Sequence, residues 1–248
     1  RETKTGYIRV YAAETFVATN GADQLPYTNW ATAASNLQDA VDAVMAGGQV
    51  WVGMGLYRLS NQVSLLRDIR VRGLAGYSNT VLERMTGTTT RLFTISHSNA
   101  AIDGLTLRNG SAPVADDNGG GVYLTAGTVR NSLITNCSAI YGGGIYMTGG
   151  MVSNTLLASN PTKAGGGASG QGGGIYLTAG EVRGCVLNGN ASTRQGAAIR
   201  MAGVGTVSHC IIIRNSDALG GVVNVTANGR IENCLVAGNT GGSSVGGG

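Results

Sequence analysis

Three tyrosines at matching positions of a repeated sequence are the residues best suited to bind a ligand. The copies GGGVYLTAG, GGGIYMTGG and GGGIYLTAG contain Tyr123, Tyr146 and Tyr176 at the same point, and Arg200 and Asn224 continue that column in two weaker copies. Stacked rings could form a flat platform for a glycan or a contact strip for a protein. Cross-strand stacking of rings also stabilises a sheet by itself. A neighbouring column consists of Thr125, Thr148, Thr178 and Thr226.

A second candidate group is acidic. Asp116, Asp117 and Asn118 are adjacent in the loop APVADDNGGG, and their oxygen atoms could contribute to a calcium site. Calcium takes six or more ligands, so another coil would have to supply further oxygens, and a solvated turn is the alternative. Asp103 lies about one partial coil earlier and could pair with Asp116 or Asp117 for acid/base chemistry. We expect no bound cofactor unless calcium occupies this loop.

The two histidines do not indicate nucleophilic catalysis. His97 and His209 are 112 residues apart, and neither lies near a GxSxG nucleophile motif. Both are expected at the surface or in corners. No catalytic residue is assigned from the sequence.

Composition narrows the class of protein. Hydrophobic residues make up 42% of the 248 residues and charged residues only 12%, with Gly at 42 and Pro at 3, so tight turns are expected rather than a disordered linker. The net charge of +4 comes from scattered basic residues, which argues against a nucleic-acid partner. No apolar run of 18 or more residues is present, so we expect no membrane span within residues 1–248.

The repeats predict the fold. Equivalent positions follow one another at steps of 23, 30, 25 and 24 residues, and the longest step contains the insertion at 161–171. Within each copy the residues alternate as in a strand, and a period of two inside a period of about 24 is typical of a β-solenoid. The equivalent positions are Val129, Val152, Val182, Val207 and Ile231.

Two further columns indicate internal ladders. Cys185, Cys210 and Cys234 share a column with Ser132 and Thr155, and the absence of CxxC spacing favours buried free thiols over a metal site. Disulfides are the alternative, although neighbouring parallel strands seldom offer the required geometry. Asparagine amides can stack and bond to the backbone at a corner. That column contains Asn160, Asn190, Asn215 and Asn239, with Cys137 in place of asparagine in the preceding coil.

The chain is therefore predicted to be an all-β, right-handed parallel β-helix of roughly eight to ten coils. Residues 1–48 would form an N-terminal cap, with a strand in GYIRVYAA and an amphipathic helix that begins at a Ser35/Gln38 capping box and stops at Gly47. Residues 49–248 would form the β-helix, regular from 119, with an open C-terminal end that could stack on another molecule.

These motifs resemble a known superfamily. The cap pattern PYTNWATAASNLQDAVDA, the following QVWVGMGLYRL and the recurrent GGGIY resemble secreted bacterial proteins of the pectin-lyase-like β-helix superfamily, especially those with polymorphic outer membrane protein-type repeats. The resemblance implies export, display at the bacterial cell surface and often adhesion. Pectate lyase-like members need acidic calcium ligands beside a basic residue on one face, and no such cluster recurs here.

The functional prediction follows from this missing cluster. We expect a non-enzymatic extracellular or cell-surface protein with a structural or adhesive role, which could form fibres by end-to-end stacking or bind surface glycans. The alternative is a carbohydrate-active enzyme, a polysaccharide lyase or hydrolase, or a glycan-binding module of the same fold.

Overall fold

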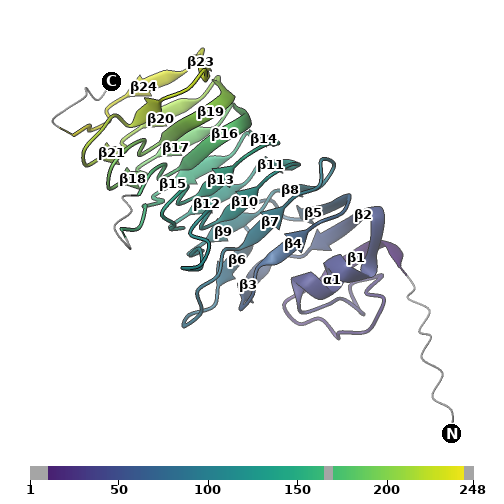
Figure 1. The fold of residues 1–248 in the computed structure, drawn as a ribbon. Coiled ribbons are helices and arrows are strands. Elements are labelled where there is room, and N and C mark those ends of the chain that lie inside the picture. Colours follow the sequence, from purple (N-terminus) through teal and green to yellow (C-terminus); the bar gives the residue numbers. More distant parts are fainter. Residues whose placement is uncertain (1–10, 165–169, 243–248) are drawn as a thin grey trace, which may run out of the picture.

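The protein is a long parallel β-solenoid with almost no helix (Figure 1). The computed structural model describes residues 11–164 and 170–242. About seven turns stack along one axis, and the third face contains eight strands, so the coil number is close to the roughly eight to ten predicted. The predicted fold class is confirmed.

Each regular coil contributes one strand to each of three faces, which we number in chain order. The first face contains β4 (Val63–Leu65), β7 (Phe93–Ile95), β10 (Val122–Leu124), β13 (Ile145–Met147), the beginnings of β16 (Ile175–Arg183) and β19 (Ile199–Ser208), and β22 (Val223–Val225). The second face contains β1 (Ala12–Val17), β2 (Val44–Val52), β5 (Ile69–Gly73), β8 (Ala101–Asp103), β11 (Thr128–Arg130), β14 (Met151–Ser153), the ends of β16 and β19, and β23 (Arg230–Glu232).

The third face is a separate eight-stranded sheet. It contains β3 (Gly55–Leu59), β6 (Thr80–Arg84), β9 (Thr106–Arg108), β12 (Leu133–Thr135), β15 (Leu156–Ala158), β17 (Val186–Asn188), β20 (Ile211–Ile213) and β24 (Leu235–Ala237). A short pair, β18 (Ala191–Ser192) and β21 (Ser216–Asp217), lies in the turn that follows this face.

The predicted columns are the observed pairs. Val122 pairs with Ile145, and Val129 pairs with Val152, so residues one repeat apart lie side by side. The inward residues of these strands are fully buried, because alternate side chains of a strand point to opposite faces. In the last described coil the equivalent residues Val225 and Ile231 are 41% and 39% exposed.

Glycine is required where each repeat enters the first face. Gly142 has φ +68°, and a Cβ there would lie 2.1 Å from the carbonyl oxygen of Ile145. The tight left-handed turn therefore excludes any side chain. Gly119, Gly172 and Gly196 repeat this geometry, which explains the recurrent glycine before each strand.

The asparagine column forms a buried ladder. The Asn160 Nδ2 donates to Asn190 Oδ1 at 2.9 Å, and Asn190 Nδ2 donates to Asn215 Oδ1 at 3.0 Å. The backbone N–H of each rung also donates to the next amide oxygen, as from Asn160 to Asn190 at 3.0 Å. Each amide thus satisfies buried backbone and side-chain groups of two coils. Cys137 ends the ladder, since its backbone N–H donates to Asn160 Oδ1.

The cysteines are free thiols, as predicted. Cys137, Cys185 and Cys210 are buried and Cys234 is partly buried. Burial raises the pKa of the Cys137 thiol to about 12. The thiols therefore behave as small buried hydrophobes and weak donors.

The N-terminal cap differs in detail from the prediction. Helix α1 covers only Leu37–Ala43, and its N-cap is Asn36, whose Oδ1 accepts from the Gln38 N–H at 2.8 Å. Ser35 instead donates its hydroxyl hydrogen to Asp23 at 2.7 Å. The helix ends before Gly47 because the chain enters β2 at Val44, so β2 crosses the predicted boundary at 48/49. The strand predicted in GYIRVYAA lies mostly outside the described residues; β1 begins at Ala12.

Candidate functional site

The three tyrosines form a continuous stack on the first face. Tyr123 pairs with Tyr146 and Tyr146 with Tyr176, with ring centroids 5.4 and 5.2 Å apart and planes within 16° and 11°. This spacing is close to the strand separation of about 4.8 Å, so each ring partly covers its neighbour. The sequence left open a flat glycan platform, a protein contact strip and plain cross-strand stacking. The structure shows rings that stack over one another rather than lying side by side in one plane.

An arginine lies at each end of this stack. The Arg91 guanidinium carbon is 5.0 Å from the centroid of the Tyr123 ring, within the range of a cation–π contact. At the other end, Arg200 pairs with Tyr176, and its Nε donates to Gln171 Oε1 at 3.0 Å and its Nη1 to Asn224 Oδ1. Arg200 was predicted from the column. Arg91 was not, because it reaches the stack from a turn outside the repeats.

A second polar column runs beside the stack. Tyr141 contacts the Tyr176 ring edge-on, with centroids 5.3 Å apart and planes at 67°. Tyr141 belongs to a column of bridged residues, each directly before the glycine of a repeat, a position that could have been found in the sequence: Asn118, Tyr141, Gln171 and Gln195. We call the tyrosine stack, Arg91, Arg200 and this column the tyrosine strip.

The phenol groups of Tyr146 and Tyr176 stay protonated at neutral pH. Burial, and then the neighbouring tyrosines, raise the pKa of Tyr146 above its ordinary value, and burial also raises the pKa of Tyr176. Each hydroxyl can therefore donate one hydrogen bond and accept others. Such groups suit a ligand that is itself rich in hydroxyls.

The acidic loop lies at one end of the strip and is neutralised by cations. Arg91 is buried and donates to the Asp116 carboxylate at 2.8 Å, and Asn118 donates to the same carboxylate at 2.7 Å. Lys163 lies 3.5 Å from the Asp117 carboxylate. Within residues 11–164 and 170–242, no cluster of three or more His, Cys, Asp or Glu could hold a metal. This donor set does not support a calcium site.

Asp103 is not brought together with Asp116 and Asp117. It lies on β8 of the second face, where Arg130 is 3.0 Å and Arg72 is 3.8 Å from its carboxylate, and Asn131 donates to it at 2.8 Å. On the same face, Arg72 pairs with Trp51 of the preceding strand β2, and the Trp51 ring lies 5.7 Å from the Arg72 guanidinium carbon. Only the strand register reveals these partners, which sequence reasoning missed.

The two histidines lie in different coils, far apart along the chain. His97 accepts from the Asn99 N–H at 3.2 Å, and His209 occupies an exposed left-handed corner with φ 54°. Among the described residues, neither histidine has a hydrogen bond to a serine, cysteine or carboxylate side chain.

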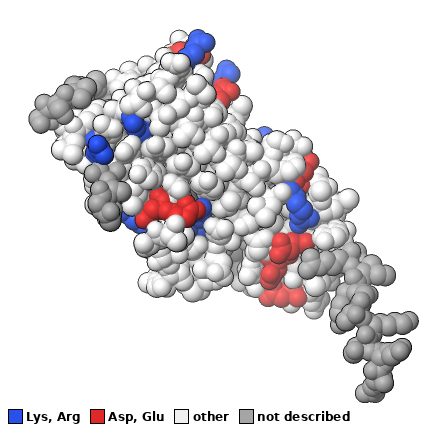
Figure 2. All heavy atoms as spheres, in the orientation of Figure 1, with Lys and Arg blue, Asp and Glu red and all other residues white. Residues whose placement is uncertain are grey.

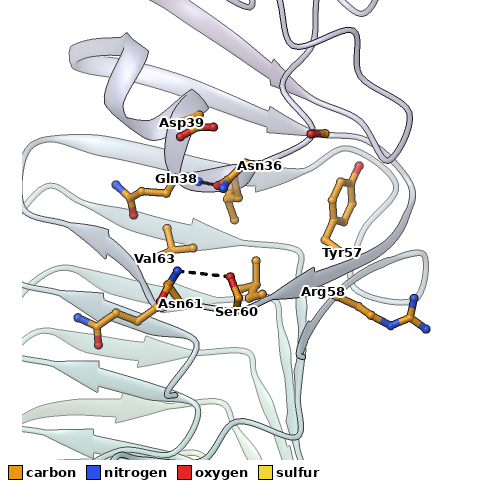
Figure 3. Close-up of a pocket in the computed structure, with 12 residues that line it drawn as sticks. Asn36, Gln38, Asp39, Tyr57, Arg58, Ser60, Asn61 and Val63 are labelled. Carbon is orange, nitrogen blue, oxygen red and sulfur yellow. Dashed lines mark hydrogen bonds between the residues drawn. The ribbon is translucent and has the colours of Figure 1, made fainter. Parts of the chain in front are cut away.

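Two hollows lie near the first face. One, of about 400 Å³, is a shallow groove at the corner between the first and second faces, along Gly127, Gly150 and Gly180. The other, of about 390 Å³, lies between the cap and the first coils (Figure 3). Sequence reasoning found neither, because each depends on how the coils stack.

Charged side chains are few on the face seen in Figure 2. They gather in one acidic group over the N-terminal end and in a second acidic group, with basic side chains beside it, near the middle of the face; the other charged groups are isolated. Among the described residues, no helix is both long and apolar enough to cross a lipid bilayer.

Comparison with known proteins establishes the fold. No family model matches the chain, and no curated protein matches its sequence significantly. A solved structure, a pectin methylesterase from Aspergillus niger, is similar over 98% of this chain and 89% of its own, with a TM-score of 0.52 and 12% sequence identity. The chain therefore has the pectin-lyase-like β-helix fold. At this identity the similarity concerns the fold alone.

This comparison corrects the prediction of a non-enzymatic protein. The similar structure is a carbohydrate-active enzyme, so the missing calcium-ligand cluster does not exclude an enzyme. The prediction failed because it tested the chain for one arrangement of catalytic groups, whereas one fold can support several different chemistries.

Proposed function

We propose that this protein is a carbohydrate-active protein that binds an extended polysaccharide along the tyrosine strip. The observation that carries the proposal is the stack of Tyr123, Tyr146 and Tyr176 between Arg91 and Arg200. Its ring edges and hydroxyls repeat at about the strand spacing, so equivalent contacts recur along one line. A polymer of hydroxyl-rich units can use such recurring contacts.

The flanking residues support the same ligand class. The amides of Asn118, Gln171 and Gln195 lie in the adjacent column, and amides both donate to and accept from hydroxyl groups. Arg200 is partly exposed at one end of the stack and could contact acidic sugars, whereas Arg91 is buried against Asp116 at the other end.

A catalytic role would fall to the acidic loop. Asp116 and Asp117 are the carboxylates next to the strip, and Arg91 and Lys163 hold them in place. Positioned carboxylates serve as acids or bases in hydrolysis and elimination at sugars. The resemblance to a carbohydrate-active enzyme supports this reading over a purely structural role. We extend the proposal to an extracellular location, where polysaccharides occur; bacterial surface display and end-to-end assembly stay predictions.

Binding is tested by gel retardation in soluble pectin, polygalacturonate, xylan and β-glucan. We expect at least one polymer to retard the protein, and Tyr146→Ala to weaken binding about tenfold, since loss of a ring contact is worth roughly 1 kcal/mol or more. Tyr146→Phe keeps the stack and should lose less. Tyr77→Ala, outside the strip, is the control. Equal retardation of Tyr146→Ala and the native protein would sink the proposal.

Activity is measured on the same polymers by release of reducing ends and by absorbance of unsaturated sugar products. Hydrolysis would appear in the first assay alone and elimination in both. We expect Asp116→Asn or Asp117→Asn to abolish either activity while leaving retardation in place. Activity that survives both substitutions would exclude the acidic loop as the catalytic site.

A further inference from the structure

The cavity between the cap and the first coils has the size of a ligand site. Its volume of about 390 Å³ falls within the usual range for small-molecule pockets. Figure 3 shows the start of α1, with Asn36 and Asp39, on one side and the turn with Ser60 and Asn61 on the other. Two segments far apart in the sequence therefore form its opposite walls.

Hydrogen bonds beside the cavity fix the distance between these two walls. The Gln38 side chain accepts from the Ser64 N–H at 2.8 Å and donates to Asp42 at 2.9 Å, so it ties the helix to β4. Leu37 and Val63 are buried among the lining residues. The cavity is thus preformed, which reduces the entropic cost of binding.

Three polar side chains that line the cavity are solvent-exposed and offer atoms with no partner within the described protein. Within the described ranges, neither the Asp39 carboxylate, the Asn36 Nδ2 nor the Asn61 Oδ1 has a hydrogen bond or ion pair. The other atoms of these amides are used, Asn36 Oδ1 by the helix and Asn61 Nδ2 by Ser60. Two acceptors and one donor are therefore free on opposing walls.

We propose that this cavity binds the terminal sugar unit of a polysaccharide. A neutral polyhydroxylated ring can donate to Asp39 and Asn61 and accept from Asn36. An anionic ligand fits less well, since Asp39 lines the cavity and the Arg58 side chain extends outward from its rim (Figure 3). A metal ion fits less well too, because Asp39 is the single carboxylate among the twelve lining residues.

The position of the cavity connects it to the strip. Gln62 lines the cavity and accepts from the Thr94 hydroxyl at 3.3 Å. Thr94 pairs with Tyr123, so Gln62 joins the cavity to the coil that precedes the tyrosine column at its N-terminal end. This inference rests on the proposed function only for the polymer that carries the terminal unit.

The test uses free sugars. Saturation-transfer NMR with glucose, galactose and mannose should detect binding to the full chain, and the double variant Asp39→Ala/Asn61→Ala should weaken it about tenfold, since two hydrogen bonds are lost. Tyr77→Ala, outside both the cavity and the tyrosine strip, should leave this signal unchanged. Circular dichroism checks that the double variant folds.

The outcomes separate the two proposals. No transfer to any of the three sugars, or equal transfer in the double variant, would overturn the cavity site even if polysaccharide retardation persists. Sugar binding that depends on Asp39 and Asn61, without Tyr146-dependent retardation, would overturn the proposed function and keep the cavity as a sugar site.

Discussion

The repeated coils and the coils before them are joined by different contacts. Residues 119–242 contain ten charged residues, as many as the much shorter stretch 44–110. The repeated coils join one another through the buried ladder of Asn160, Asn190, Asn215 and Asn239. The earlier coils use ion pairs at the surface, such as Arg72 with Asp103 and Arg108 with Glu83.

In the repeated coils, the contacts that stabilise the solenoid lie inside it, and the residues available for binding lie on its surface. A buried amide ladder fixes the register inside the solenoid, so the outward positions of the repeated coils are free to form the tyrosine strip. In the earlier coils the outward positions carry the charge pairs. Irregular turns there create the cavity beside the cap.

The largest expected effect is loss of a ladder rung. Asn190→Ala should lower the free energy of unfolding by about 4 kcal/mol, because it removes four hydrogen bonds and leaves buried groups unpaired, at about 1–3 kcal/mol each. Urea unfolding followed by circular dichroism measures it.

Two further substitutions serve as comparisons for Asn190→Ala. Asn188→Ala changes an outward asparagine two residues away and should cost under about 0.5 kcal/mol. Asp103→Asn, in the earlier coils, should cost only about 1 kcal/mol, since its arginine partners are half exposed. If Asn190→Ala costs no more than Asp103→Asn, the two regions do not differ as described.

Substitution of either of two glycines by alanine should lower the free energy of unfolding by a smaller amount. Gly142→Ala should destabilise by about 3 kcal/mol, because the new Cβ meets the Ile145 carbonyl in addition to the left-handed strain. Gly76→Ala, at φ +70° with open space around it, should cost only the strain of about 1 kcal/mol. Thermal unfolding compares the two variants, and equal losses would show that close packing is not what requires glycine in the repeats.

The pH dependence of stability above pH 9 tests the burial of Cys137, whose thiol contacts the Leu107 carbonyl where the earlier coils meet the repeated coils. Its pKa is raised to about 12 in the folded protein, from the ordinary value of 9.0, so the thiol keeps its proton when the unfolded chain has lost it. Stability should be unaffected by this group below pH 9 and fall by about 1.4 kcal/mol per pH unit between 9 and 12. Denaturant unfolding across this range should show a shallower decline for Cys137→Ala. Parallel declines would mean that Cys137 is not buried as described.

Much of the fold could be predicted because its pattern is local. Tyr123, Tyr146 and Tyr176 were aligned by the repeated GGG, and the structure pairs them as expected. The N-cap was misplaced by one residue, because Ser35 and Asn36 both suit that position and only tertiary contact with Asp23 occupies Ser35.

The sequence by itself determined the solenoid, its inward columns and its two ladders, since a period of two within a period of about 24 leaves little choice of register. The tertiary structure decided which groups from other turns meet those columns. Arg91 on Tyr123, Arg72 and Arg130 on Asp103, and Asn61 opposite Asp39 each depend on turn length and stacking between unlike coils. Such contacts join residues with no common repeat, so no pattern along the chain indicates them.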